Sequence, residues 1–257
     1  MQRTKKTLQS LDNYSAIGFD MDHCLVQYNV KEFFPIAYRS IAQVLVEQKN
    51  YPPEMLEFGK REKCFIMNGL IIDIETGYIF KLGQDKVILR AYYGYDPVSQ
   101  EDLEEKYGSP PVYAEFDPYK IRTKKYICCL TYFDCCLSAI VAHMIQYKKQ
   151  IHREDELDIA EIIQDAKFAE HFNYQNCSKN VYHSVQGFGY FFRDLLKDLD
   201  KIVTKQQKNK EILQALRKKG KILFLASNSV DEYVSILMEH SFGPDWLELF
   251  DFVIASA

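Results

Sequence analysis

The sequence lacks the features that mark several classes of protein. Its 257 residues carry a net charge of −4 and a pI of about 5.9, so no basic excess indicates nucleic-acid binding. Its longest mainly apolar run, residues 135–145, is too short to cross a bilayer. The basic start of the chain is not followed by an apolar segment, as a signal peptide requires. With no repeats or low-complexity segments, the sequence predicts a cytoplasmic protein that binds neither nucleic acid nor membrane.

Cysteine is present but in no pattern that a metal or disulfide framework needs. The chain has seven cysteines, an odd number, with no Cys-x-x-Cys pair. This argues against both a disulfide framework and a zinc site. We expect Cys128, Cys129, Cys135 and Cys136 to be small core residues of a protein in a reducing compartment.

Two carboxylates stand at the end of an apolar run in residues 16–25. The run predicts a central parallel strand, and ligands of open α/β sheets bind at the carboxyl ends of such strands. Residues two apart in a strand point to the same side, so Asp20 and Asp22 are expected to face one pocket. Carboxylates this close are tolerated when a divalent cation lies between them or their pKa values are split. The alternative is that Asp22 caps the next helix and Asp20 is a loop acid.

A second apolar strand, residues 221–226, ends at a small hydroxyl side chain. Ser227 and the free N–H groups of a following helix N-terminus suit a phosphate group. Alternatively, Ser229 or Asp231 is only the N-cap of that helix. One strand ending in Asp-x-Asp and another ending in Ser, with a large insertion between them, is more specific than either strand alone.

These segments carry a resemblance to a known superfamily. Residues 20–25 resemble the nucleophile motif of the haloacid dehalogenase (HAD) superfamily, and residues 225–229 resemble its phosphate-binding motif. More narrowly, residues 14–257 are similar to the cytosolic purine 5′-nucleotidases and the 5′-nucleotidase domain-containing proteins. The resemblance implies an α/β fold, a HAD-like Rossmannoid core with a parallel sheet and a large cap inserted between the two motifs. We expect the core to span 1–60 and 186–257, and the cap 61–185.

The resemblance also implies a two-step phosphoryl transfer. Asp20 would be the nucleophile that forms an aspartyl phosphate, and Asp22 the general acid and base. Mg²⁺ would be held by the Asp20 carboxylate and the Asp22 backbone carbonyl. Ser227 would hold a phosphate oxygen together with backbone N–H groups near Asn228.

The sequence departs from the family pattern at two places. Cys24 stands where the family usually has Thr or Val, which is a mild change. The family's later Lys and metal-binding Asp motifs would lie beyond Ala257. We therefore expect a core sheet without its C-terminal strands, with residues 16–20 at an exposed apolar edge and weak or no activity for this chain alone.

The expected function is Mg²⁺-dependent hydrolysis of nucleoside 5′-monophosphates to nucleoside and phosphate. The alternatives are a phosphatase acting on another small phosphoester, and a catalytically inactive scaffold or regulatory protein with the same fold. By resemblance, Phe133 and Asp134 lie near the base-binding position of the purine nucleotidases; the alternative makes Phe133 a core residue. His183 and Arg193 are weaker candidates for phosphate or cap contacts. The resemblance also suggests a homo-oligomer.

The hydrophobic pattern of the insertion predicts its main helices and strands. The expected elements are a helix at 36–48, a hairpin of strands 69–74 and 78–82, an acidic helix at 100–106, one or two buried helices at 126–147, and helices at 158–171 and 181–199.

Overall fold

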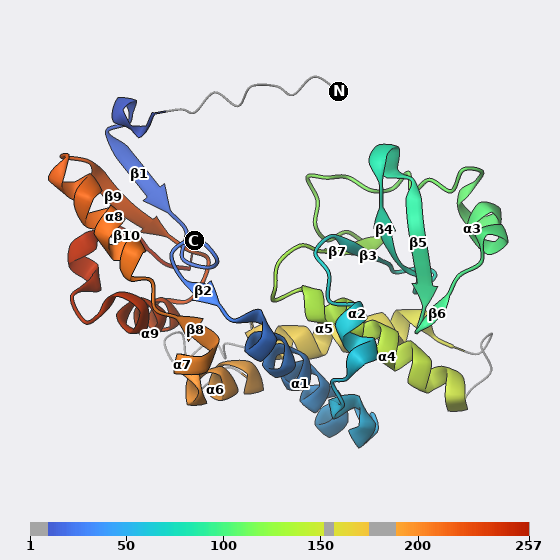
Figure 1. The fold of residues 1–257 in the computed structure, drawn as a ribbon. Helices are drawn as coiled ribbons and strands as arrows, with labels where there is room; N and C mark the ends of the chain where they lie inside the picture. Colours follow the sequence, from blue (N-terminus) through green and yellow to red (C-terminus); the bar gives the residue numbers. More distant parts are fainter. Residues whose placement is uncertain (1–9, 152–156, 175–188, 257) are drawn as a thin grey trace. The chain divides into compact units, whose positions relative to one another are not determined.

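The computed structural model describes residues 10–151, 157–174 and 189–256, which form two compact units (Figure 1). Among these residues, one unit contains 10–30 and 198–256, and the other contains the rest. The expected division placed residues 31–60 in the core. The compact units place them with the inserted residues, because the helix that begins there packs on inserted residues: the Tyr38 hydroxyl lies 2.7 Å from Nδ1 of His143.

The first unit is built on a three-stranded parallel sheet with the order β1-β9-β10. Its strands are β1 (Ala16–Phe19), β9 (Ile222–Ala226) and β10 (Phe252–Ile254). The register of β1 on β9 runs from Ala16 opposite Ile222 to Phe19 opposite Leu225. The parallel sheet confirms the α/β class, and β1 lies at an edge of this sheet, as expected.

Shorter elements complete the first unit. They are η1 (Leu11–Asn13), β2 (Gln27–Tyr28), α7 (Leu199–Ile202), β8 (Val203–Thr204), α8 (Gln207–Lys218), α9 (Asp231–Phe242) and η6 (Trp246–Leu249). Strands β2 and β8 pair in the antiparallel sense, with Tyr28 opposite Val203. This small ribbon ties the residues just after β1 to the residues just before α8.

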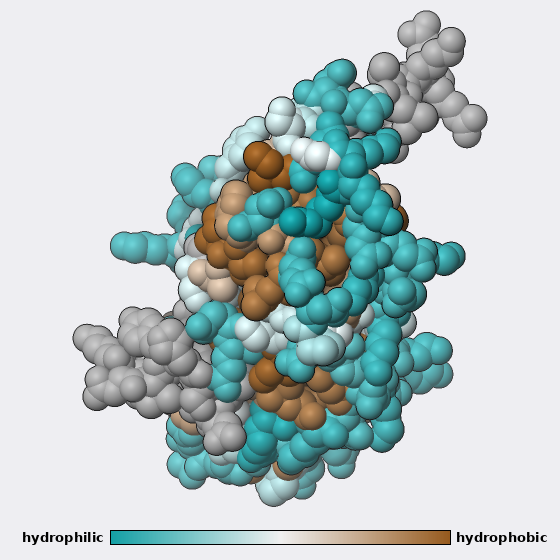
Figure 2. All heavy atoms as spheres, turned by 90° about the vertical axis from the view of Figure 1, so that its left-hand side faces the viewer, coloured by the Kyte–Doolittle hydropathy of each residue, from teal (hydrophilic) through white to brown (hydrophobic). Residues whose placement is uncertain are grey.

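The core sheet has one buried and one exposed face. Leu223 and Leu225 of β9 are fully buried, whereas Ile222 is 46% exposed. On the same face as Ile222, Phe252 and Ile254 of β10 are 48% and 44% exposed. On the side of the molecule where β1, β9 and β10 are drawn in Figure 1, apolar side chains gather at the surface (Figure 2). The β9 pattern is therefore that of a strand covered on one side.

The second unit is built on an antiparallel sheet with the order β6-β5-β4-β3-β7, together with several helices. Its elements are α1 (Val30–Lys49), η2 (Pro53–Leu56), α2 (Lys60–Cys64), β3 (Leu70–Asp73), β4 (Ile79–Leu82), η3 (Gln84–Lys86), β5 (Ile88–Tyr93), β6 (Asp96–Pro97), α3 (Gln100–Tyr107), β7 (Tyr126–Cys129), α4 (Cys135–Ile151), α5 (Ile159–Tyr174) and α6 (Tyr190–Lys197). The fold thus contains a large unit inserted between β1 and β9.

Most predicted elements of the insertion are confirmed, with shifted ends. The β3-β4 hairpin and the helices α1, α3 and α5 all form where expected. The prediction of helix from residue 126 onward is wrong, because residues 126–129 form strand β7 and the helix α4 begins only at residue 135. All four β7 residues are buried, so their continuous apolar run carries no period that separates strand from helix. Residues 181–188 of the last predicted helix lie outside the described residues.

One absence and one confirmation concern the whole described chain. None of the helices in the described ranges is both long enough and apolar enough to span a bilayer. Cys128, Cys129, Cys135 and Cys136 are buried free thiols, as predicted for core residues.

Gly18 of β1 lies directly beneath an aromatic side chain of β9. A Cβ atom on Gly18 would lie 2.4 Å from Cζ of the Phe224 ring, closer than van der Waals contact permits. Phe224 in turn stacks on Phe252 of β10, with ring centroids 5.0 Å apart and planes inclined by 6°. The absence of a side chain at position 18 therefore allows this aromatic pair to lie flat across the three strands.

Replacing Gly18 by Ala is expected to destabilise the first unit by about 1 kcal/mol, the low end of the cost of overpacking, because the half-buried Phe224 ring can partly move away. The midpoint of urea unfolding reports the loss. The double substitution Gly18→Ala with Phe224→Ala removes the clash, so the two single effects should not add. Additive effects would contradict the close contact between position 18 and the ring.

Candidate active site

Asp20 lies at the carboxyl end of β1, where the chain makes a tight turn. Its side chain is exposed, and Oδ1 accepts a hydrogen bond of 2.7 Å from the N–H of Met21. The carbonyl of the buried Met21 accepts hydrogen bonds from the N–H groups of Leu25 and Val26, at 3.0 and 2.9 Å. This turn holds the Asp20 carboxylate at the end of the sheet.

Ser227 follows β9 at the same end of the sheet. Its side chain is buried, and its N–H donates to the carbonyl of Ile254, at 2.9 Å. The Ser227 Oγ accepts a hydrogen bond of 3.2 Å from the N–H of Ser229, while Asn228 between them is exposed. Because β1 and β9 are parallel neighbours, Asp20 and Ser227 both follow the carboxyl ends of these strands and lie at the same end of the sheet.

Asp22 joins the two motifs directly. Its Oδ2 accepts a hydrogen bond of 2.9 Å from the Ser229 hydroxyl, and its Oδ1 accepts one of 2.5 Å from the Tyr28 hydroxyl. The Tyr28 hydroxyl also lies 3.0 Å from the hydroxyl of Tyr233 on α9. The structure thus brings Asp22 and the segment that follows β9 into contact.

Two of the structural alternatives for these residues are wrong. The N-cap of α9 is Val230, with no side-chain hydrogen bond, so neither Ser229 nor Asp231 fills that position. The residues after Asp22 form a turn that leads into β2, so Asp22 caps no helix there. The Ser229 hydroxyl is instead used on the Asp22 carboxylate.

The surroundings of Asp22 shift its ionisation. Burial raises the pKa of Asp22 above its ordinary value, and the nearby Asp20 charge adds to that increase. The hydrogen bonds from Tyr28 and Ser229 act in the opposite direction. A raised pKa is the direction that a carboxyl group needs to donate a proton near neutral pH. Burial also lowers the pKa of His23, which favours the neutral imidazole.

The oxygen atoms at the end of β1 are compatible with Mg²⁺. The Asp20 carboxylate is exposed, and none of the backbone hydrogen bonds that close the turn uses the Asp22 carbonyl. Both are hard oxygen ligands, and Mg²⁺ commonly takes one or two protein oxygens and keeps several waters. The described residues contain no cluster of three or more His, Cys, Asp or Glu side chains that could hold a metal ion.

Phe133 lies in an aromatic cluster of the second unit. Its ring packs edge-on against Phe33 and Phe191, with centroid distances of 5.3 and 5.8 Å. Asp134 accepts a hydrogen bond of 3.0 Å from Arg122, whose guanidinium also binds both oxygens of the buried Glu170. These contacts give both predicted residues a structural use, and their role in base binding stays a prediction.

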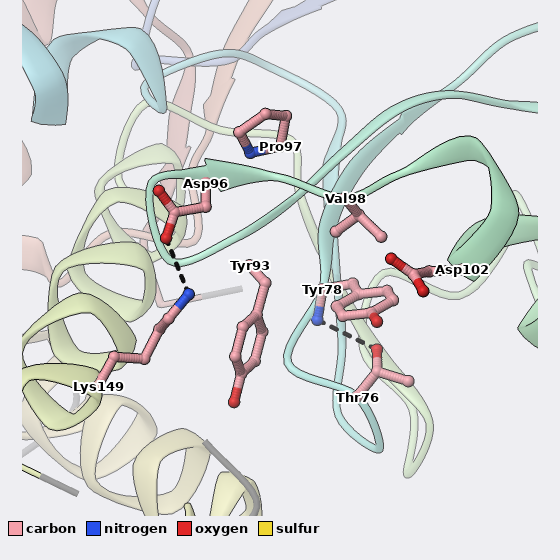
Figure 3. Close-up of a pocket in the computed structure, with 8 residues that line it drawn as sticks. All are labelled: Thr76, Tyr78, Tyr93, Asp96, Pro97, Val98, Asp102 and Lys149. Carbon is pink, nitrogen blue, oxygen red and sulfur yellow. Dashed lines mark hydrogen bonds and ion pairs between the residues drawn. The ribbon is translucent and has the colours of Figure 1, made fainter. Parts of the chain in front are cut away.

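Of the two weaker candidates, the structure describes only Arg193. Arg193 pairs with the adjacent Asp194 at 2.9 Å, and His183 lies outside the described residues. A separate cavity of about 370 Å³ lies in the second unit and is lined by the turn between β3 and β4, by β5, β6 and α3, and by α4. Tyr78, Tyr93 and the Asp96–Lys149 ion pair are among its lining residues (Figure 3). None of its lining residues was predicted as a site residue.

Sequence reasoning missed Tyr28 and Tyr233 as site residues. Tyr233 lies within α9 and is almost completely buried, as an apolar side chain of that helix would be. Tyr28 follows Asp22 by six residues in a segment with no motif. The only signal was chemical: a buried tyrosine hydroxyl requires a hydrogen-bond partner, and carboxylates at the same sheet end could supply one.

Comparisons with known proteins agree on one family. The model of the 5′ nucleotidase family matches residues 5–257. The chain is 30% identical over 256 residues to human 5′-nucleotidase domain-containing protein 1, and 30% identical over 253 residues to the Bos taurus protein of the same name. It is 26% identical over 254 residues to human 5′-nucleotidase domain-containing protein 2.

Coverage differs between this chain and those relatives. Each match covers 96% of this chain, but only 54%, 54% and 45% of the relatives, so the chain spans about half their length. Among solved structures, a predicted phosphoglycolate phosphatase from Haemophilus somnus 129PT aligns at 16% identity and a TM-score of 0.34, covering 96% of this chain and 64% of that one. A likeness this low supports no argument about fold or activity.

The hydrogen bond from Ser229 should be visible in the ionisation of Asp22. Replacing Ser229 by Ala removes a donor to the carboxylate, so the pKa of Asp22 should rise further. Carboxyl ¹³C NMR of metal-free protein measures this value. Ser235→Ala, at an exposed position of α9, is the matched control. An unchanged or lower pKa in Ser229→Ala would sink the assignment.

Proposed function

The chain belongs to the 5′ nucleotidase family. From that premise we propose that it carries the nucleophile, the general acid and base, and the phosphate-binding segment of a phosphatase acting on nucleoside 5′-monophosphates. Asp20 is its nucleophile, Asp22 its general acid and base, and Ser227 with Asn228 its phosphate-binding segment. The observation that carries the proposal is that these residues follow the carboxyl ends of two neighbouring parallel strands. The Ser229 hydroxyl after the second strand also donates a hydrogen bond to Asp22 after the first.

The first step would form a covalent bond to Asp20. The exposed carboxylate attacks the phosphorus atom, and the bond between phosphorus and the ribose 5′ oxygen breaks. Asp22 gives its proton to that oxygen as the nucleoside leaves. The raised pKa of Asp22 supports this assignment, because the proton must still be present near neutral pH.

The second step would restore the site. Asp22, now a carboxylate, takes a proton from a water molecule, whose oxygen attacks the phosphorus of the aspartyl phosphate. The bond between phosphorus and Asp20 breaks, releasing inorganic phosphate and the free carboxylate. One residue thus serves as acid and then as base, which suits a carboxyl group whose pKa lies above its ordinary value.

The charges in the site call for a cation. A phosphate dianion would be repelled by the Asp20 carboxylate, and after the first step also by the Asp22 carboxylate. Mg²⁺, held by the Asp20 carboxylate and the Asp22 carbonyl, would offset that repulsion and polarise the phosphoryl oxygens. The Ser227 hydroxyl and the N–H groups near Asn228 would hold a phosphate oxygen.

Asp20 should be essential for phosphate release. Replacing Asp20 by Asn removes the attacking carboxylate, so release from a panel of nucleoside monophosphates with Mg²⁺ should fall by about 10³-fold or more. The panel is run on this chain and on a form that extends to the full length of the relatives. Asp200→Asn, at an exposed carboxylate of the same unit, should keep full activity.

The same panel separates the proposal from its rivals. Release from other small phosphoesters alone would replace the nucleotide by another substrate. No release from any ester in either form would overturn the enzymatic proposal in favour of a scaffold with this fold.

Removing the metal should abolish the reaction reversibly. Treatment with EDTA leaves the carboxylates and the phosphate uncompensated, so phosphate release should stop and return when Mg²⁺ is added. Ca²⁺ should restore little, because it prefers a larger and more flexible coordination shell. Full activity in chelator would contradict the metal requirement, and circular dichroism checks that the fold is unchanged.

A further inference from the structure

A chain of buried hydroxyl groups ends on the Asp22 carboxylate. The hydroxyls of Tyr233 and Tyr28 lie 3.0 Å apart, and Tyr28 donates to Asp22 Oδ1 at 2.5 Å. On the other side, Ser229 donates to Asp22 Oδ2 at 2.9 Å. Each carboxylate oxygen therefore accepts a hydrogen bond from a different segment, one from β2 and one from the loop after β9.

The two tyrosines are fixed in place by their surroundings. Tyr28 is 4% exposed and Tyr233 is 1% exposed. The backbone of Tyr28 pairs with Val203 in the β2-β8 ribbon, and Tyr233 lies in the first turn and a half of α9. Neither ring can turn without losing packing, and a buried hydroxyl that lost its partner would cost free energy.

This arrangement restricts how the Asp22 side chain can turn. A carboxyl group held at one oxygen can still rotate about that bond, whereas one held at both oxygens by rigid elements has one orientation. The backbone hydrogen bonds that close the turn around Asp22, such as that from the His23 N–H to the Val26 carbonyl at 2.9 Å, fix the main chain but not the carboxyl group. The orientation of the carboxyl group is therefore set from β2 and from the loop after β9.

We propose that Tyr28, itself held by Tyr233, is a positioning residue that fixes the Asp22 carboxyl group in the orientation required for proton transfer to the leaving group. This inference rests on the proposed function, in which Asp22 is the general acid. Tyr28 touches Asp22 and acts through it. A misplaced acid loses much of its benefit, because proton transfer requires hydrogen-bond reach to the leaving oxygen.

The alternative is a purely structural role, in which the hydroxyls only satisfy each other within the core. The two roles differ in their dependence on the leaving group. An alkyl leaving group such as the ribose 5′ oxygen needs a proton, whereas p-nitrophenolate leaves without one. Because Asp22 also acts as the base in the second step, which both substrates share, the comparison is made on the first step. Loss of positioning should slow release of the nucleoside but leave the initial burst of p-nitrophenolate unchanged, and loss of structure should slow both.

The test compares Tyr28→Phe and Tyr233→Phe with unaltered protein on a nucleoside 5′-monophosphate and on p-nitrophenyl phosphate. We expect Tyr28→Phe to lower kcat for the nucleotide by about 10- to 100-fold, with KM and the rate of the p-nitrophenolate burst changed less than about twofold. Tyr233→Phe should act in the same direction with a smaller effect. Tyr119→Phe, at a position 94% exposed, is the matched control and should change nothing.

Several outcomes overturn the inference. Equal losses in the nucleotide rate and in the p-nitrophenolate burst would make the hydroxyl structural, and no loss in either would show that Asp22 is oriented without it. A crystal structure of metal-free Tyr28→Phe gives a reading that needs no activity: the Asp22 carboxylate should turn about its remaining hydrogen bond to Ser229, and an unmoved carboxylate would contradict the proposal. Failure of the function itself appears elsewhere, as activity that survives Asp20→Asn.

Discussion

The parallel pairing of β1 with β9 is the constraint on which the candidate site depends. Register places Phe19 opposite Leu225, so the residues that follow each strand emerge side by side. Asp20 needs no other element to lie near Ser227. The remaining contacts of the site, from the hydroxyl groups on Asp22 to the ribbon of β2 and β8, refine an arrangement that the backbone ladder has already made.

The core sheet and the motifs at its carboxyl end could be predicted, because they depend on local patterns. A short apolar run that stops at polar residues shows where a strand ends, and the type of those polar residues indicates the chemistry. The boundaries of the two units could not be read in this way. Residues 31–60 follow the first motif without any break in composition, and only the packing of α1 assigns them to the second unit.

Two other features were outside the reach of sequence reasoning for a physical reason. Strand β7 is buried on both faces, so its residues show neither the alternation of a half-exposed strand nor a helical period. The contact of Tyr28 with Asp22 and Tyr233 depends on side chains from three elements that meet only in the folded chain. By contrast, the alternative that makes Phe133 a core residue needed only its residue type, and its ring does pack in an aromatic cluster. The neighbouring Asp134 forms an ion pair with Arg122.

The long insertion between β1 and β9 has a consequence for synthesis on the ribosome. The residues of β1 are made about 200 positions before the strand with which they pair in the described structure. At translation rates of about 5–20 residues per second, that interval is on the order of 10 to 40 s. During this time an apolar segment with unpaired backbone groups has emerged, while the inserted unit is still being completed. The nascent chain therefore has a defined period in which chaperone binding at residues 16–19 would compete with aggregation, and that period ends when β9 leaves the exit tunnel.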